Sequence, residues 1–184
     1  MRTTKNSGIG WLGDVPEDWR ITKFRYVFRE SKEVNGASPV GEMLSVSGYR
    51  GVVPKVYESD SLKRADDQLE TYRVVRKGQL AVNTMWLNYG GLGVSDFEGH
   101  MSPAYRSYWI SDKLHPRYAH HLLRSSTYIA AYTSYLTGVR PNSLQMSRDS
   151  LMNFPILLPP LEEQKAIADF LDAELSRIDV LMER

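Results

Sequence analysis

Three segments of the chain carry side chains of the types that read double-stranded DNA. Proteins hold DNA through cations on the phosphates, and they distinguish base pairs through Arg on guanine, Asn or Gln on adenine and apolar groups on the thymine methyl. The residues that we predict to bind DNA are Tyr49, Arg50 and Lys55 in the first segment, Asn83, Met85, Trp86, Asn88 and Tyr89 in the second, and Arg140, Asn142 and Arg148 in the third.

The second and third segments each allow a plainer interpretation. Met85, Trp86 and Tyr89 belong to a glycine-rich connection, where large apolar side chains either pack into the core or meet a partner. Residues 138–148 include two Arg and no acidic residue. This favours phosphate contacts, although an ordinary polar loop has a similar composition. The sequence leaves both alternatives open.

Side chains suited to catalysis or metal binding form no recognisable site in the sequence. The four histidines lack the i, i+4 spacing with which two imidazoles share a metal on a helix. The chain has no cysteine, which excludes a thiol nucleophile and a Cys-ligated zinc. There is no Gly-x-Ser-x-Gly motif, and the glycines at 90–93 lack the rest of a phosphate-binding loop. We therefore predict that the chain is not an enzyme and holds no metal or cofactor by itself.

The composition is that of a globular domain with an uneven charge distribution. The chain has 184 residues, 42% of them hydrophobic and 24% charged, which predicts one main domain with a real core. Residues 1–100 carry 14 Lys and Arg against 13 Asp and Glu, residues 101–148 carry 6 against 1, and residues 149–184 carry 3 against 8. Unless this pattern arises by chance, the cationic middle and the acidic tail have different partners. The lack of cysteine, of an export signal and of a membrane span predicts a cytoplasmic protein.

The elements that must position these residues change from strand to helix along the chain. Short β-rich runs between Gly, Pro and polar clusters predict that residues 40–110 are mostly strand. From Pro116 the period becomes helical, with a break near Ser125 and Ser126, which predicts two helices. The segment from 23 to 33 favours a short amphipathic helix, with a strand as the alternative.

The C-terminal segment has the clearest helical pattern. Pro159 and Pro160, followed by acidic residues, are typical of a helix start. Apolar residues then recur at spacings of 3, 4, 3 and 4, as in a coiled-coil seam, and these are Ala168, Leu171, Leu175, Ile178 and Met182. We predict that the seam is a subunit interface, with packing on its own domain as the alternative. The pattern still runs at Arg184 without a cap, so we expect the helix to be cut there.

Three motifs resemble the specificity subunit of type I restriction-modification enzymes. They are IGWLGDVPEDW at 9–19, RKGQLAVN at 76–83, and FPILLPPLEEQKAIA at 154–168 followed by FLD at 170–172. The third motif is highly specific, the first is moderately so, and the resemblance covers nearly the whole chain.

The resemblance implies an α+β fold with two parts. A target recognition domain of mixed α/β structure, mostly β in its central region, is expected over residues 1–158, and a long coiled-coil-type helix is expected from residue 159 to residue 184. A complete subunit has two such domains and two helices, and each domain reads one half of a split DNA target. One domain and the start of one helix are found here, so we expect half of a subunit or a natural half that forms a homodimer.

The resemblance also implies partners that carry the chemistry. The modification subunits dock along the helices and the restriction subunit joins that core, so S-adenosylmethionine, ATP and Mg are expected on the partner subunits only. A protein-interaction or oligomerisation module without DNA binding remains the main alternative. Salt dependence separates the two, because DNA binding through several phosphates weakens steeply with salt and apolar association does not.

Overall fold

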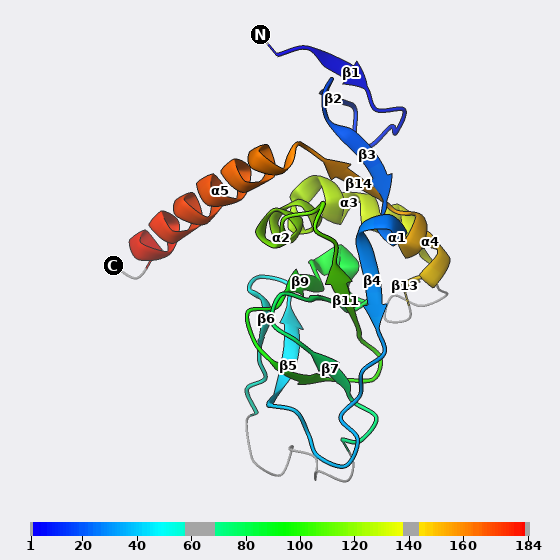
Figure 1. Ribbon diagram of the computed structural model, residues 1–184, viewed down its shortest axis with the longest axis vertical. Helices are drawn as coiled ribbons and strands as arrows, with labels where there is room; N and C mark the ends of the chain where they lie inside the picture. Colours follow the sequence, from blue (N-terminus) through cyan, green and yellow to red (C-terminus); the bar gives the residue numbers. More distant parts are fainter. Residues whose placement is uncertain (1, 58–68, 138–143, 183–184) are drawn as a thin grey trace.

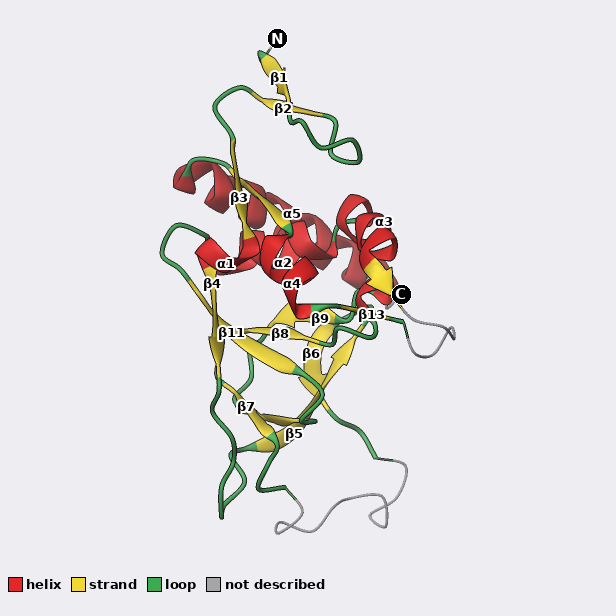
Figure 2. Cartoon of the chain, turned by 90° about the vertical axis from the view of Figure 1, so that its right-hand side faces the viewer, coloured by secondary structure: helices red, strands yellow, loops and turns green. Residues whose placement is uncertain are grey.

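A computed structural model describes residues 2–57, 69–137 and 144–182 of the chain. This part has a strand-rich region at one end, helices in the middle and an N-terminal hairpin at the other end (Figures 1 and 2). None of the helices in these ranges is long and apolar enough to cross a membrane. The predicted α+β class, with a sheet-rich domain and a long C-terminal helix, is confirmed.

The described elements alternate between short strands and short helices until the long C-terminal helix. The strands are β1 (Thr4–Asn6), β2 (Asp14–Pro16), β3 (Arg20–Lys23), β4 (Phe28–Ser31), β5 (Glu42–Ser47), β6 (Gly51–Pro54), β7 (Arg73–Val75), β8 (Leu80–Val82), β9 (Leu92–Val94), β10 (Gly99–Met101), β11 (Arg106–Ile110), β12 (Leu136–Thr137), β13 (Gln145–Met146) and β14 (Pro155–Leu158). The helices are α1 (Phe24–Val27), the 3-10 helix η3 (Leu87–Tyr89), α2 (Pro116–Arg124), α3 (Ser126–Tyr135), α4 (Arg148–Asn153) and α5 (Leu161–Met182).

Two four-stranded sheets form the strand-rich region. One has the order β6-β5-β10-β7 and the other β4-β11-β8-β9. Their pairs are antiparallel except β5 with β10, which is parallel. Two-stranded pairs of β1 with β2, β12 with β13 and β14 with β3 complete the described strands.

The hydrophobic core joins the second sheet to the helices. Strands β4, β8, β9 and β11 contribute apolar side chains to one large cluster that also contains residues of α2, α3 and α4. Ala168 of α5 belongs to the same cluster and is fully buried. A smaller cluster joins the first sheet to Ala81 of β8 in the second sheet. The helices therefore form a layer with one face on the second sheet, and the loops of that sheet are held by packed elements (Figure 2).

The helix favoured for residues 23–33 is wrong for most of its length. The chain forms a single helical turn, α1, and then becomes extended at Phe28 with φ −127° and ψ 130°. Phe24, Val27 and Phe28 are all buried, and strand β4 pairs antiparallel with β11. Pairing with a neighbouring strand that is remote in sequence outweighs the local helical pattern, and a one-turn helix is too short to be stable by itself.

The two helices predicted after Pro116 are confirmed. Pro116 occupies the first turn of α2, where its missing N–H needs no partner. The break falls at Ser125, whose hydroxyl accepts a hydrogen bond from the Tyr128 backbone N–H and so caps α3. Both helices pack on the second sheet through buried residues, among them Tyr118, Leu123 and Tyr132.

Helix α5 is docked at its start and free at its far end. Gln164, 1% exposed, donates from its amide to the Lys113 and Pro159 carbonyls at 3.0 and 2.9 Å and accepts from the His115 backbone N–H at 2.8 Å. About two turns further, Asp172 accepts hydrogen bonds from the Arg117 guanidinium on α2. Toward its C-terminal end the helix runs out from the body (Figure 1), and its apolar residues Leu175, Ile178 and Met182 are exposed.

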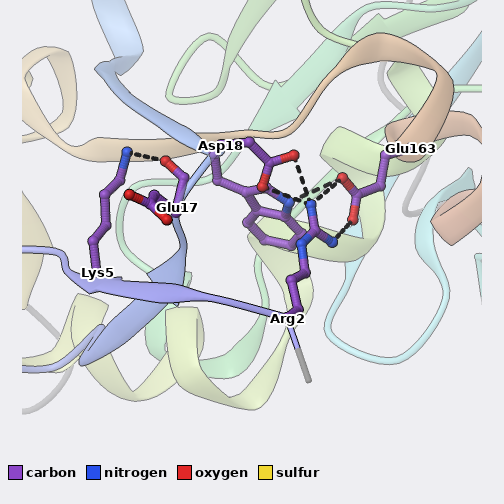
Figure 3. Close-up of polar contacts among 6 residues, drawn as sticks. Arg2, Lys5, Glu17, Asp18 and Glu163 are labelled. Atoms are coloured by element: carbon purple, nitrogen blue, oxygen red, sulfur yellow. Dashed lines mark hydrogen bonds and ion pairs between the residues drawn. The ribbon is translucent and has the colours of Figure 1, made fainter.

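The N-terminal segment is tied to the start of α5. The Arg2 guanidinium lies between the carboxylates of Asp18 and Glu163, and the Trp19 indole N–H donates to Glu163 at 3.1 Å (Figure 3). Trp11 stacks on Phe154 with ring centroids 5.5 Å apart. The N-terminal segment is thus tied to the rest of the domain through both Trp11 and Trp19.

Candidate nucleic-acid interface

Most of the predicted DNA-binding residues in the described ranges lie on or next to three neighbouring connections, and Lys55 lies apart from them, after β6. The turn at 47–50 joins β5 to β6, the loop at 83–91 joins β8 to β9, and the β12–β13 hairpin precedes α4. Arg140 and Asn142, both predicted to bind DNA, lie outside the described residues. The remaining nine predicted residues can be placed.

The loop at 83–91 is built rigidly from within. The Asn83 side-chain oxygen accepts from the Met85 backbone N–H at 3.2 Å, and the Asn83 N–H donates to the Gly91 carbonyl at 2.7 Å. A Cβ at Gly91 would lie 2.6 Å from the Trp86 carbonyl oxygen, so only glycine fits there. Leu87 anchors the loop and is fully buried. Asn83, 5% exposed, therefore holds the loop together and does not face its surface.

The same loop presents its large apolar side chains to solvent. Met85, Trp86 and Tyr89 are 39%, 57% and 64% exposed. The Trp86 and Tyr89 rings lie 5.4 Å apart and are tilted to each other. Burial of these three side chains in the core, the plainer interpretation, is wrong, because Leu87 fills the core position in their place. Asn88 is half-buried.

Arg124, at the end of α2, was not singled out from the sequence. Its side chain joins the turn at 47–50 to the end of the loop at 83–91. Its guanidinium donates to five backbone carbonyls at 2.7–3.4 Å. These carbonyls belong to Ser47, Gly48, Tyr49, Gly90 and Leu92. Burial lowers the pKa of Arg124. In the sequence, a cation near the C-terminal end of a helix is explained by the helix dipole. No sequence signal therefore indicated that Arg124 binds backbone carbonyls of two loops.

The Arg124 contacts bring the turn at 47–50 against the loop at 83–91. A Cβ at Gly48 would lie only 2.2 Å from the Tyr89 carbonyl oxygen, which shows how closely the two backbones approach. Tyr49, 72% exposed, and Arg50 lie at the tip of this turn. Lys55, also exposed, follows the end of β6, and its ammonium lies 5.0 Å from the Tyr57 ring centroid.

The third connection is joined to the loop at 83–91 by a backbone hydrogen bond. The Met146 N–H donates to the Thr84 carbonyl at 3.1 Å. Exposed Gln145 and Arg148 therefore lie next to Met85, and all three line one groove of about 330 Å³. Three sequence-distant segments thus form one continuous surface that carries aromatic, amide and cationic side chains.

The structure divides the predicted subunit interface on α5. Ala168 is fully buried in the domain's own core and so cannot contact another subunit, which corrects its prediction. Leu171 is half-buried. Leu175, Ile178 and Met182 are 49%, 49% and 69% exposed. The plainer alternative, packing on the same domain, holds for the first turns of the helix and fails for the last ones.

The family comparison matches the C-terminal part of the chain. Residues 106–182 match the family described as the type I restriction modification DNA specificity domain. No curated protein matches the sequence.

Solved structures match the fold over nearly the whole chain. The HsdS subunit from Thermoanaerobacter tengcongensis has 19% identity and a TM-score of 0.59, and the match covers 98% of this chain. A structure of a type I R-M system, described for its complex assembly and conformational transition, has 18% identity, a TM-score of 0.58 and 97% coverage. The type I restriction-modification S subunit from M. genitalium has 14% identity, a TM-score of 0.57 and 97% coverage.

The chain spans 42% of the length of each of these three proteins. At such low identity the likeness shows the fold alone. The chain therefore has a fold similar to that of an S subunit, and its residues 106–182, less than half of its length, match the type I restriction modification DNA specificity domain family.

Proposed function

We propose that the chain is the sequence-specific DNA-recognition part of a type I restriction-modification specificity subunit. It reads one half of a bipartite target and directs the modification and restriction subunits to it. The observation that carries the proposal is the single surface on which Met85, Trp86 and Tyr89 stand exposed beside Arg50 and Arg148. The family match and the S-subunit fold support it.

The chemistry of this surface suits DNA better than protein. Arg50 and Arg148 are exposed on it, and phosphate contacts supply a large share of the affinity of DNA-binding proteins. Exposed aromatic and thioether side chains can contact thymine methyls or unstack a base step. Because the loop at 83–91 is fixed before binding, little ordering entropy opposes these contacts.

The proposal assigns the chemistry to other subunits. The chain recognises DNA and is not itself an enzyme, while S-adenosylmethionine, ATP and Mg belong to its partners. The exposed apolar residues of α5, Leu175, Ile178 and Met182, provide the docking site for modification subunits. We place the chain, together with the DNA that it binds, in the cytoplasm.

The test is selection of bound duplexes from a random DNA library. It is run at about 50 and 200 mM salt, because phosphate contacts weaken steeply over that range. Each salt condition is tested with and without modification subunits from a matching system. Enrichment of one short motif supports the proposal, and enrichment only with the subunits present means that α5 must be clamped first. A folded chain that enriches no motif under any condition contradicts it.

The same experiment addresses the alternative of a protein-interaction module. That module would use the aromatic loop and α5 for protein contacts and would show no salt-dependent DNA binding. Because Met, aromatic residues and Arg are enriched in protein interfaces too, the salt dependence of binding is the observation that separates the two functions.

A further inference from the structure

A groove beside the aromatic loop contains a chain of ion pairs that the proposed function does not explain. The groove has a volume of about 330 Å³ and lies between β4, β11, the loop at 83–91 and the start of α4. Tyr108, 1% exposed, contributes to its floor, and burial raises the pKa of Tyr108 to about 12, so its hydroxyl stays neutral. Met85 and Gln145 line the groove near the surface.

Glu30 of β4 is the centre of the ion-pair chain. Its carboxylate accepts from the Arg148 guanidinium at 3.2 Å and lies 3.5 Å from the Arg106 Nε. The Glu30 side chain is only 16% exposed, whereas that of Arg148 is 73% exposed. The cluster therefore links a sheltered carboxylate to an arginine that faces solvent.

Arg106 is fixed by the backbone and in turn fixes Glu30. Its Nη1 donates to the Pro103 and Tyr105 carbonyls at 2.8 and 2.9 Å. Glu30 pairs with this fixed Arg106 on one side and with Arg148 on the other. Arginine carries five N–H donors in a planar fork, so the bond to Glu30 leaves most of the Arg148 fork free.

The Glu30 carboxylate offsets part of the positive charge of Arg148, so a phosphate gains less from this guanidinium than from an unpaired one. Arg106, Glu30 and Arg148 together keep a net charge of +1, so the site still tolerates nearby DNA. A guanine edge suits the site better, because its O6 and N7 are neutral acceptors that match the fork of arginine. The neighbouring amide of Gln145 and the methyl group of Met85 are further groups that contact base edges.

We infer that Arg148 reads a guanine of the DNA target, and that Glu30 and Arg106 are positioning residues that set the direction of its guanidinium. This inference rests on the proposed function, since it names the residue that supplies part of the sequence specificity. It makes one position of the selected motif a G·C pair.

The first test is Arg148→Lys, which keeps the charge and removes the fork. Binding is measured with labelled duplexes that carry the selected motif, each single-base change of it, or an unrelated sequence. The expected result is that the preference for guanine at one position falls about tenfold to a hundredfold, while affinity for the unrelated duplex and the salt slope are unchanged. The matched control is Arg177→Lys, because the Arg177 side chain is 74% exposed and pairs with Glu174 at 2.8 Å on the free half of α5. It should change neither quantity.

The second test is Glu30→Gln, which keeps the shape and removes the charge. Discrimination at the same position should fall, while affinity for the unrelated duplex should stay equal or rise, because a negative charge leaves the DNA-facing side. A merely structural role for Glu30 would lower both, together with the unfolding midpoint.

The outcomes separate this inference from the proposed function. If the wild type selects a motif and Arg148→Lys keeps every base preference, the inference is overturned and the proposed function stands. If Arg148→Ala weakens all duplexes equally and lowers the salt slope by about one, Arg148 holds a phosphate and the inference is again overturned. If the wild type selects no motif, both are overturned.

Discussion

A single guanidinium, that of Arg124, gives the candidate interface its shape. Arg124→Lys replaces five possible donors by three on one nitrogen, which cannot reach carbonyls on both the turn at 47–50 and the loop at 83–91. We expect the free energy of unfolding to fall by about 2 kcal/mol, because buried carbonyls lose their partners. DNA affinity should fall too, with an unchanged salt slope, because Arg124 is occupied by the backbone and touches no phosphate. Urea unfolding and a salt titration of binding measure these two effects; a slope reduced by one would place Arg124 on the DNA.

Neighbouring residues of the aromatic loop should separate binding from stability. Trp86→Ala removes a side chain that is 57% exposed, so the free energy of unfolding should change by less than about 0.5 kcal/mol. DNA affinity should nevertheless fall.

Leu87→Ala is the matched control, because Leu87 is fully buried in the adjacent position. It should cost about 3 kcal/mol of unfolding free energy through the cavity that it leaves. The two measurements are urea unfolding and duplex binding. Equal losses of stability in both variants would mean that Trp86 is part of the core.

The residue types of this surface could be predicted, but their exposure could not. The sequence places Asn83, Met85 and Leu87 in one glycine-rich loop, and nothing in it tells which of them points inward. That choice depends on Gly91, which lets the backbone close on Trp86, and on contacts with distant elements. The roles of Arg124 and Glu30 were missed for the same reason, because their partners lie in distant parts of the chain.

At the scale of elements, patterns that are satisfied locally were predicted and those satisfied at a distance were not. The break at Ser125 has its cap within three residues, so it was visible in the sequence. Residues 23–33 become mostly strand because β11 pairs with β4, and that partner lies far along the chain. The heptad seam of α5 was correct as a pattern, yet Ala168 meets the chain's own core while Leu175 meets solvent. A periodic pattern gives the apolar face of a helix but not what covers it.

Where α2 packs on β9, His120 should make the free energy of unfolding fall in mild acid. His120 Nδ1 accepts from the Val94 backbone N–H at 3.2 Å, and burial, with nearby Arg124 and Arg117, lowers the His120 pKa to about 3. Because the unfolded state takes up a proton near pH 6.5 and the folded state does not, stability falls as pH drops below about 6.5. His120 should therefore cost about 2 kcal/mol at pH 5 relative to pH 7.

His120→Asn isolates this contribution, because asparagine keeps an acceptor oxygen near the Nδ1 position but does not titrate. It should be less stable than the wild type at pH 7 and should lose about 2 kcal/mol less between pH 7 and pH 5. Urea unfolding at the two pH values gives the answer. Identical pH dependence in both proteins would show that His120 is protonated in the folded state.

At the scale of the whole molecule, the candidate interface with its exposed Arg50 and Arg148 is separate from the acidic helix α5, which leaves the domain (Figure 1). The clasp of Arg2, Trp19 and Glu163 and the bonds of Gln164 fix the first turns of α5 to the domain. A helix held at its base and free beyond it sets the position of any subunit bound there relative to the DNA surface. Binding of DNA and of modification subunits should therefore depend on different residues and respond differently to salt.

The double substitution Leu175→Glu with Ile178→Glu tests that separation. Both side chains are 49% exposed, so the free energy of unfolding should change little, and the chain's own DNA binding should be kept if it binds without partners. Co-purification with modification subunits should be lost, because two charges would be buried at an apolar contact, and the wild-type association should persist in high salt, which weakens DNA binding instead. Glu substitution at exposed Ser176, one residue from Leu175 on the same helix, is the matched control and should leave co-purification intact. If the double variant still binds modification subunits, the docking site lies elsewhere on the chain, and the exposed half of α5 has another partner.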